Sequence, residues 1–163
     1  METEFIQIIS NNARLLHTVC KLYCTDEEDR KDLRQEIVLQ LWRAFPTFRR
    51  EAQLSTWMYR IALNTAITLV RRQVRRPVRA PITDDLLDVL PVPVSEETDE
   101  RMEQFYGAVE QLSAVEKALV FLYLDDNSYE EIAEVMGISP SNVGVKLSRI
   151  RGKLKKIVEL TNE

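Results

Sequence analysis

The side chains of this chain that could do chemistry are mainly cations, and they gather in two stretches. Residues 140–156 contain six Lys or Arg and no acid, and residues 43–80 contain nine Arg and one Glu. Lys and Arg bind phosphate oxygens, so each stretch predicts a surface for a nucleic-acid backbone. The net charge of −4 does not exclude this, because phosphate binding follows local potential and residues 81–139 alone sum to −13.

The C-terminal basic stretch belongs to a predicted helix-turn-helix. Ser128 and Glu131 have the spacing of a capping box, which predicts a helix that begins after Ser128. Gly137 suits the left-handed position that ends such a helix. Ser139 followed by a proline then predicts the start of a second helix.

That second helix is predicted to bury one face and expose the other. The apolar residues recur at helical spacing: Val143, Leu147, Ile150 and Leu154. The opposite face carries Asn142, Val145, Lys146, Arg149 and Lys153. A helix-turn-helix inserts such a helix into the major groove of DNA. The alternative is a helical hairpin with a solvated basic face, but the capped first helix, the glycine turn and the Ser-Pro start together favour DNA binding.

The other basic stretch combines arginine with aromatic rings. Ser55 predicts the start of a long helix that runs to about Arg76 and contains no acid. Its functional candidates are Trp57, Tyr59, Arg60, Asn64, Arg71, Arg72 and Arg75. Rings that stack on bases, beside Arg that binds phosphates, are typical of a platform for single-stranded nucleic acid. For Trp57 and Tyr59 the alternative is packing in a core.

A third pattern lies on the helix predicted from Thr25 to about Phe45. Thr25 and Glu28 have the spacing of a capping box, and Pro46 ends the helix. The predicted core stripe is Leu33, Ile37, Leu41 and Phe45. Outside it remain Asp32, Gln35, Glu36, Leu39 and Trp42. An exposed Trp beside Leu and carboxylates predicts a protein-binding face, the alternative being packing beneath neighbouring helices.

No arrangement of residues supports catalysis or a cofactor. The chain has one His and no Gly-rich phosphate loop. His17, Cys20 and Cys24 share a helix face, but three ligands make an incomplete structural zinc site, so we expect no metal. Both thiols are interpreted as small apolar residues of a reduced, cytoplasmic protein. The N-terminus lacks the basic region of a signal peptide, and no apolar run reaches the roughly 20 residues of a membrane span.

Composition predicts an all-α fold in two parts. The chain has 163 residues, of which only four are Gly, and four of its six Pro fall between positions 77 and 94. Prolines at that density break regular structure, which predicts a linker. We therefore expect two small helical domains, residues 1–76 and 95–163, joined by a Pro-rich linker at 77–94. The second domain contains the helix-turn-helix and a further capped helix after Ser113, with Glu116 completing its box.

Three stretches together resemble the extracytoplasmic-function (ECF) group of bacterial sigma factors. They are DLRQEIVLQLWRAFPTF at 32–48, LSTWMYRIALN at 54–64 and LSAVEKALVFLYLDDNSYEEIAEVMGISPSNVGVKLSRIRGKL at 112–154. The resemblance implies a non-catalytic factor that binds core RNA polymerase and directs it to promoter DNA. The −35 element would be read as duplex and the −10 element as melted single strand. It also implies an anti-sigma factor as partner, and no small-molecule substrate.

The resemblance assigns roles to individual positions. Polymerase binding is implied for Asp32, Gln35, Glu36, Leu39 and Trp42. Binding of the −10 element is implied for Phe48, Arg49, Arg50, Trp57, Arg60, Asn64, Arg71 and Arg72. Binding of the −35 element is expected of Ser141, Asn142, Lys146, Arg149 and Lys153. The chain departs from the group at Thr68, where Asp is common, and at Gly144, where a polar or basic residue is usual.

Two other functions fit part of the sequence. A dimeric helix-turn-helix regulator would bind a palindrome without polymerase. A sigma-like decoy would bind polymerase and support no initiation.

Overall fold

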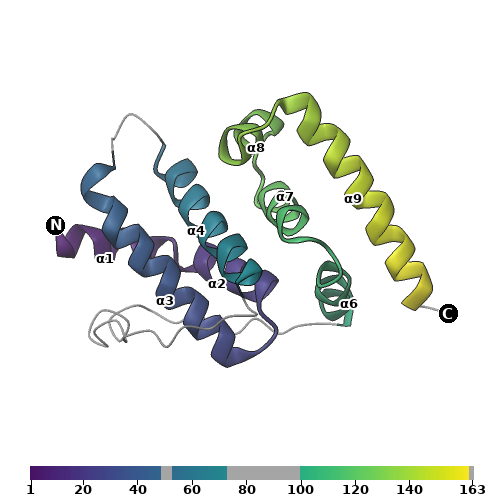
Figure 1. The fold of residues 1–163 in the computed structure, drawn as a ribbon, viewed down its shortest axis with the longest axis horizontal. Coiled ribbons are helices and arrows are strands. Elements are labelled where there is room, and N and C mark those ends of the chain that lie inside the picture. Colours follow the sequence, from purple (N-terminus) through teal and green to yellow (C-terminus); the bar gives the residue numbers. More distant parts are fainter. Residues whose placement is uncertain (49–52, 73–99, 162–163) are drawn as a thin grey trace. The chain divides into compact units, whose positions relative to one another are not determined.

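The computed structural model describes residues 1–48, 53–72 and 100–161, and the regular structure in these ranges is helical, with no strand (Figure 1). The chain divides into two compact units, Met1–Ser95 and Glu96–Glu163. The predicted all-α fold in two helical domains is therefore confirmed. The linker predicted at 77–94 lies outside the described residues.

The described residues of the first unit form four α-helices and one short 3₁₀ turn. They are α1 (Glu2–Asn11), α2 (Ala13–Tyr23), α3 (Glu27–Ala44), η1 (Phe45–Thr47) and α4 (Leu54–Arg71). Helix α3 packs against both α2 and α4 (Figure 1). The fully buried side chains of this core include Phe5 and Ile9 of α1, Leu33 of α3, and Met58 and Leu63 of α4.

Two helix starts differ from the sequence prediction. The N-cap of α3 is Asp26 and not Thr25: the Glu28 N–H donates to Asp26 Oδ1 at 3.4 Å. Both a carboxylate and a threonine hydroxyl can accept this bond, but only the charged carboxylate also interacts favourably with the helix dipole. Helix α4 begins at Leu54, so Ser55 lies inside its first turn and Gln53 is an N-cap without a side-chain bond.

The remaining boundaries of the first unit follow the sequence closely. A break separates α1 from α2 at Asn12, where the side-chain amide of Asn12 donates to the Ile8 carbonyl at 2.8 Å. Phe45 lies in η1 and is only half-buried, so the core stripe of α3 ends at Leu41. The predicted extension of α4 to Arg76 falls on positions outside the described residues.

The second unit contains α6 (Glu100–Val109), α7 (Ala114–Leu124), α8 (Tyr129–Met136) and α9 (Pro140–Thr161). Both of its predicted capping boxes are present, at Ser113 before α7 and at Ser128 before α8. Gly137 ends α8 in the left-handed conformation at φ 71°. The Asn142 N–H donates to Ser139 Oγ at 3.1 Å, which confirms the predicted cap of α9.

Helix α9 packs on α6, α7 and α8 through its predicted apolar stripe. Val143, Leu147 and Ile150 are buried, whereas Leu154 is half-buried. Burial thus decreases toward the C-terminal half of α9. Within the parts of the chain described here, no helix is both long and apolar enough to cross a membrane.

Candidate nucleic-acid and protein interfaces

The outer side of α9 presents a polar and basic surface just after the turn from α8. Ser141, Asn142, Val145 and Arg149 are exposed and Lys146 is half-buried. We call these five residues the α9 surface. Neither Lys146 nor Arg149 forms an ion pair with another described residue. The turn, the caps and the apolar stripe thus leave two cations, an amide and a hydroxyl directed away from the core.

Gly144, the departure in the middle of this helix, has a local explanation. A Cβ placed there would lie 3.4 Å from Cε2 of the Tyr129 ring, which comes from the first turn of α8. The ring therefore covers the position that a longer side chain would occupy. Position 144 thus has room for a methyl group but not, without movement of the Tyr129 ring, for a longer side chain in that direction.

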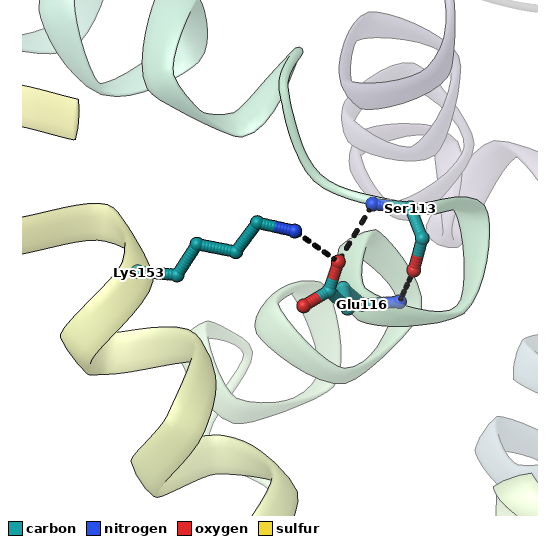
Figure 2. A network of polar contacts seen from close by, with 3 residues as sticks. All are labelled: Ser113, Glu116 and Lys153. Carbon is teal, nitrogen blue, oxygen red and sulfur yellow. Dashed lines mark hydrogen bonds and ion pairs between the residues drawn. The ribbon is translucent and has the colours of Figure 1, made fainter. Parts of the chain in front are cut away.

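Lys153 is placed differently from the other predicted −35 residues. Its Nζ donates to Glu116 Oε1 at 3.1 Å, and the same oxygen accepts the Ser113 N–H at 2.8 Å (Figure 2). Partial burial alone would raise the pKa of the Glu116 carboxyl, but the hydrogen bonds from Ser113 and Lys153 outweigh it, and the pKa is lowered. The structure thus brings Lys153 to the N-terminus of α7.

Arg151, two residues earlier, also contacts α7. Its Nη2 donates to Tyr123 Oη at 3.1 Å, and its guanidinium carbon lies 5.5 Å from the centroid of the Tyr123 ring. Two of the six cations of α9 are therefore engaged with α7. Sequence spacing could not have shown these two contacts, because Tyr123 lies 28 residues before Arg151 and Glu116 lies 37 residues before Lys153.

In the first unit, the two predicted faces of α3 differ in burial. Leu33, Ile37 and Leu41 are fully buried. None of the five residues of the predicted polymerase-binding set is buried: Asp32 is exposed, and Gln35, Glu36, Leu39 and Trp42 are half-buried. We call this set the α3 surface. Val38 is also fully buried, which the four-residue periodicity missed.

Trp42 belongs partly to the packing of the unit. Its ring meets the fully buried Phe5 ring edge-on, with centroids 4.9 Å apart. Packing thus accounts for one side of the indole, and the rest of the half-buried side chain remains accessible. The packing alternative therefore holds for one side of the ring, and the protein-binding role of its accessible part stays a prediction.

Helix α4 exposes the polar residues predicted for −10 binding. Arg60, Asn64, Arg71 and Arg72 are exposed, and so is the departure Thr68. Tyr59, in contrast, is buried, so the core alternative is correct for this residue. Its spacing to the buried Ala62, Leu63 and Ala66 is that of one helix face, which could have indicated its burial from the sequence.

The aromatic residues at the start of α4 form a cluster. The centroid of the half-buried Trp57 ring lies 4.7 Å from that of the Phe48 ring and 6.4 Å from that of the Phe45 ring. The centroids of the Phe45 and Phe5 rings are 5.5 Å apart. Phe48 and Trp57, predicted to bind the same DNA element, are thus neighbours. Arg49 and Arg50 lie outside the described residues.

A groove between α3 and α4 was not expected from the sequence. Its volume is about 270 Å³, and its lining is Glu36, Gln40, Asn64, Thr65, Thr68, Leu69 and Arg72. The Gln40 amide donates to Glu36 Oε1 at 3.0 Å. The groove brings Glu36 of the α3 surface close to Asn64 and Arg72 of α4.

The two cysteines, Cys20 and Cys24, are buried in the first unit. Burial, with a smaller contribution from the neighbouring Cys24, raises the pKa of Cys20 to about 12. Both thiols therefore behave as small apolar groups, as predicted. Among the residues that the structure describes, no three His, Cys, Asp or Glu side chains form a group that could hold a metal ion.

Comparison with known proteins identifies both units. The family model for Sigma-70 region 2 matches residues 8–76, and the one for Sigma-70, region 4, matches residues 102–154. The chain is 26% identical to the ECF RNA polymerase sigma factor SigM of Mycobacterium tuberculosis over 159 residues, covering 97% of this chain and 79% of SigM. It is 29% identical to the RNA polymerase sigma factor YlaC of Bacillus subtilis over 140 residues, covering 83% of this chain and 81% of YlaC.

Two solved structures share the fold. CnrH, in complex with the cytosolic domain of CnrY, has a TM-score of 0.70 and 20% identity, covering 98% of this chain and 90% of CnrH. The sigma factor RpoE of Bartonella quintana, in complex with the anti-sigma factor NepR, has a TM-score of 0.72 and 20% identity, covering 96% of this chain and 97% of RpoE. Regions 2 and 4 in this order, with relatives named as ECF factors, show that the chain belongs to the ECF group of RNA polymerase sigma factors, which bind RNA polymerase and direct promoter-specific initiation.

Proposed function

We propose that the second unit reads the −35 element as duplex DNA, while the first unit binds core RNA polymerase and holds the −10 element as a melted single strand. The α9 surface is the observation that carries this proposal. It follows a capped helix and a left-handed glycine turn, and it directs Lys146 and Arg149 away from the core. A recognition helix contacts base edges through residues near its N-terminus, which is where Ser141 and Asn142 lie.

The chemistry of the α9 surface suits a mixed contact with the major groove. Asn142 can pair with an adenine edge, Arg149 with guanine or a phosphate, and the exposed Val145 with a thymine methyl group. Lys146 supplies a further phosphate contact. Gly144 contributes no side chain, so base recognition is concentrated on its neighbours in the helix.

The −10 element is assigned to the start of α4 and the residues before it. Phe48 and Trp57 offer neighbouring rings for stacking, and Arg60 and Asn64 are exposed further along the helix. Arg71 and Arg72, with Arg49 and Arg50 outside the described residues, complete the proposed phosphate contacts. Aromatic rings combined with cations are what sequence-tolerant binding of a single strand requires.

Polymerase binding is assigned to the α3 surface. Leu39 and Trp42, both half-buried, are neighbours on one face of α3, and Asp32, Gln35 and Glu36 continue that face toward the N-terminus of the helix. Apolar groups bordered by polar ones are typical of a protein interface. The factor carries no catalytic residues in this proposal, because chemistry belongs to the polymerase. It works in the cytoplasm with that enzyme and is controlled by an anti-sigma factor, as the complex of RpoE with NepR suggests.

Holoenzyme binding to separate promoter pieces tests this assignment. Core polymerase saturated with the full chain is titrated with a −35 duplex and, separately, with a single-stranded non-template −10 oligonucleotide, both from promoters selected on a library. Arg149→Ala is expected to weaken only duplex binding, and Arg60→Ala only single-strand binding. Loss of both activities in both variants contradicts the division of labour.

Two experiments test the alternative functions. In gel shifts of the free chain without polymerase we expect weak binding at most, and tight binding to a palindrome would indicate a dimeric regulator. In transcription assays with core polymerase, binding to the enzyme without any initiation would indicate a decoy.

A further inference from the structure

We propose that Lys153 and Glu116 form a positioning pair that orients α9 on α7, and that Lys153 acts through Glu116 rather than by contacting promoter phosphate. The proposal rests on the proposed −35 role of α9. The sequence groups Lys153 with Lys146 and Arg149, because positions 146 and 153 are seven residues apart and share a helix face. The structure distinguishes Lys153 from the other two, because among the described residues it is the one of the three that contacts a carboxylate of another helix.

Glu116 is a fixed acceptor for this contact. It is the N3 residue of α7, and its capping box with Ser113 holds both its backbone and its side chain: the Glu116 N–H donates to Ser113 Oγ at 3.2 Å, and Glu116 Oε1 accepts the Ser113 N–H at 2.8 Å. Lys153 Nζ binds this same oxygen at 3.1 Å (Figure 2). A single carboxylate therefore caps α7 and holds α9.

A second contact holds α9 at the other end of α7. Arg151 hydrogen-bonds Tyr123 Oη at 3.1 Å and lies over its ring. Glu116 and Tyr123 are seven residues apart, which is about 10 Å along α7, whereas Arg151 and Lys153 are separated by about 3 Å along α9. Two neighbouring cations of α9 thus reach opposite ends of α7.

Such an arrangement adds direction to the packing of α9. The apolar stripe of Val143, Leu147 and Ile150 fixes how closely α9 approaches the core, but apolar contacts are non-directional. Hydrogen bonds have preferred directions, so the two contacts with α7 favour one rotation of α9 about its axis. That rotation determines where Asn142 and Arg149 point.

The test compares holoenzymes carrying Glu116→Gln, Lys153→Gln and the double variant on a promoter with its −35 element. Glutamine at 116 still accepts the Ser113 N–H, so the cap of α7 is retained. Glu110→Gln, which removes an exposed carboxylate from the same unit, controls for the general effect of losing a negative charge. Promoter affinity is measured at several salt concentrations.

If the pair positions α9, both single variants weaken promoter binding relative to Glu110→Gln, by at most about fivefold, the limit for an exposed ion pair. The double variant is then no weaker than either single variant, and the salt dependence is unchanged. If Lys153 instead contacts phosphate, Lys153→Gln makes the negative slope of log affinity against log salt shallower by about 0.9. In that case Glu116→Gln tightens binding, because a neutral amide holds the ammonium group less strongly than a carboxylate does and leaves it available to the phosphate. Either result overturns the proposal.

Two measurements separate failure of the pair from failure of the −35 assignment. The first uses DNA: if Arg149→Ala leaves promoter affinity unchanged, the proposed role of α9 itself is wrong. The second needs no DNA. The coupling between Glu116 and Lys153 is then measured by a double-mutant cycle on urea unfolding of the full chain. A favourable coupling supports the positioning pair, and zero coupling overturns it whatever the role of α9.

Discussion

Replacing Trp42 with alanine is expected to have two effects, and the structure allows them to be separated. The indole is half-buried, and its ring meets Phe5 edge-on at 4.9 Å. A fully buried Trp→Ala change costs about 3–5 kcal/mol, so a half-buried ring predicts a loss of about 2 kcal/mol in the free energy of unfolding. For a unit of this size, that loss lowers the unfolding temperature by on the order of 10 °C.

The second effect is on polymerase binding. An accessible Trp at the centre of a protein interface commonly carries more than 1 kcal/mol of binding energy, so we expect Trp42→Ala to weaken polymerase binding about tenfold or more. The dissociation constant is measured by competition for core polymerase at a temperature well below the unfolding transition of the variant. A weaker complex alone does not distinguish a lost contact from a destabilised unit.

Phe5→Leu is the matched control. Phe5 is fully buried, so it cannot touch the polymerase, and it pairs with the rings of both Trp42 and Phe45. Losing two ring pairs costs about 1–3 kcal/mol, which matches the destabilisation expected of Trp42→Ala. We expect Phe5→Leu to bind polymerase within about threefold of the wild-type chain. If both variants lose the same affinity at equal stability, Trp42 acts through packing and the proposed interface is wrong at this position.

Three further predictions concern the other sites. Gly144→Ala should stabilise the second unit by about 0.5–1 kcal/mol in urea unfolding, because its methyl group would lie 3.4 Å from the Tyr129 ring, at van der Waals distance. Gly152→Ala, with nothing within 4 Å, is the reference, and destabilisation at position 144 alone would show that the ring cannot accept the methyl group. Cys20, whose pKa burial raises to about 12, should resist iodoacetamide at pH 8 in the folded chain and react in urea; stability should fall as pH rises from 9 to 12, because the thiol ionises first in the unfolded chain. Arg149→Ala should reduce promoter-dependent transcription and leave polymerase affinity intact, and an affinity loss equal to that of Trp42→Ala would contradict separate roles.

The features of the fold that the sequence predicted best depend on local interactions. Capping boxes at Ser113 and Ser128 and the left-handed Gly137 involve residues within a few positions of each other, and all three are present. The errors at Thr25 and Ser55 are local as well. In each case an adjacent residue, Asp26 or Leu54, marks the actual start of the helix, and spacing alone does not rank such neighbours.

What the sequence could not predict depends on contacts between distant positions. Phe5 covers one side of Trp42, and Glu116 binds Lys153 across 37 positions. Periodicity places a residue on a face of its own helix, but not opposite a particular partner. The predicted faces of α3 and α9 therefore agree with the observed burial, whereas the environments of Trp42 and Lys153 emerged only from the structure.

Transcription by a reconstituted holoenzyme tests the central claim most directly. Core RNA polymerase is mixed with the full chain and a promoter library, and the 5′ ends of the transcripts are mapped. We expect transcripts that start downstream of a shared pair of −35 and −10 elements, that require the added chain, and that are lost with Arg149→Ala. Polymerase binding without any transcript that depends on the chain would contradict its role as an initiation factor.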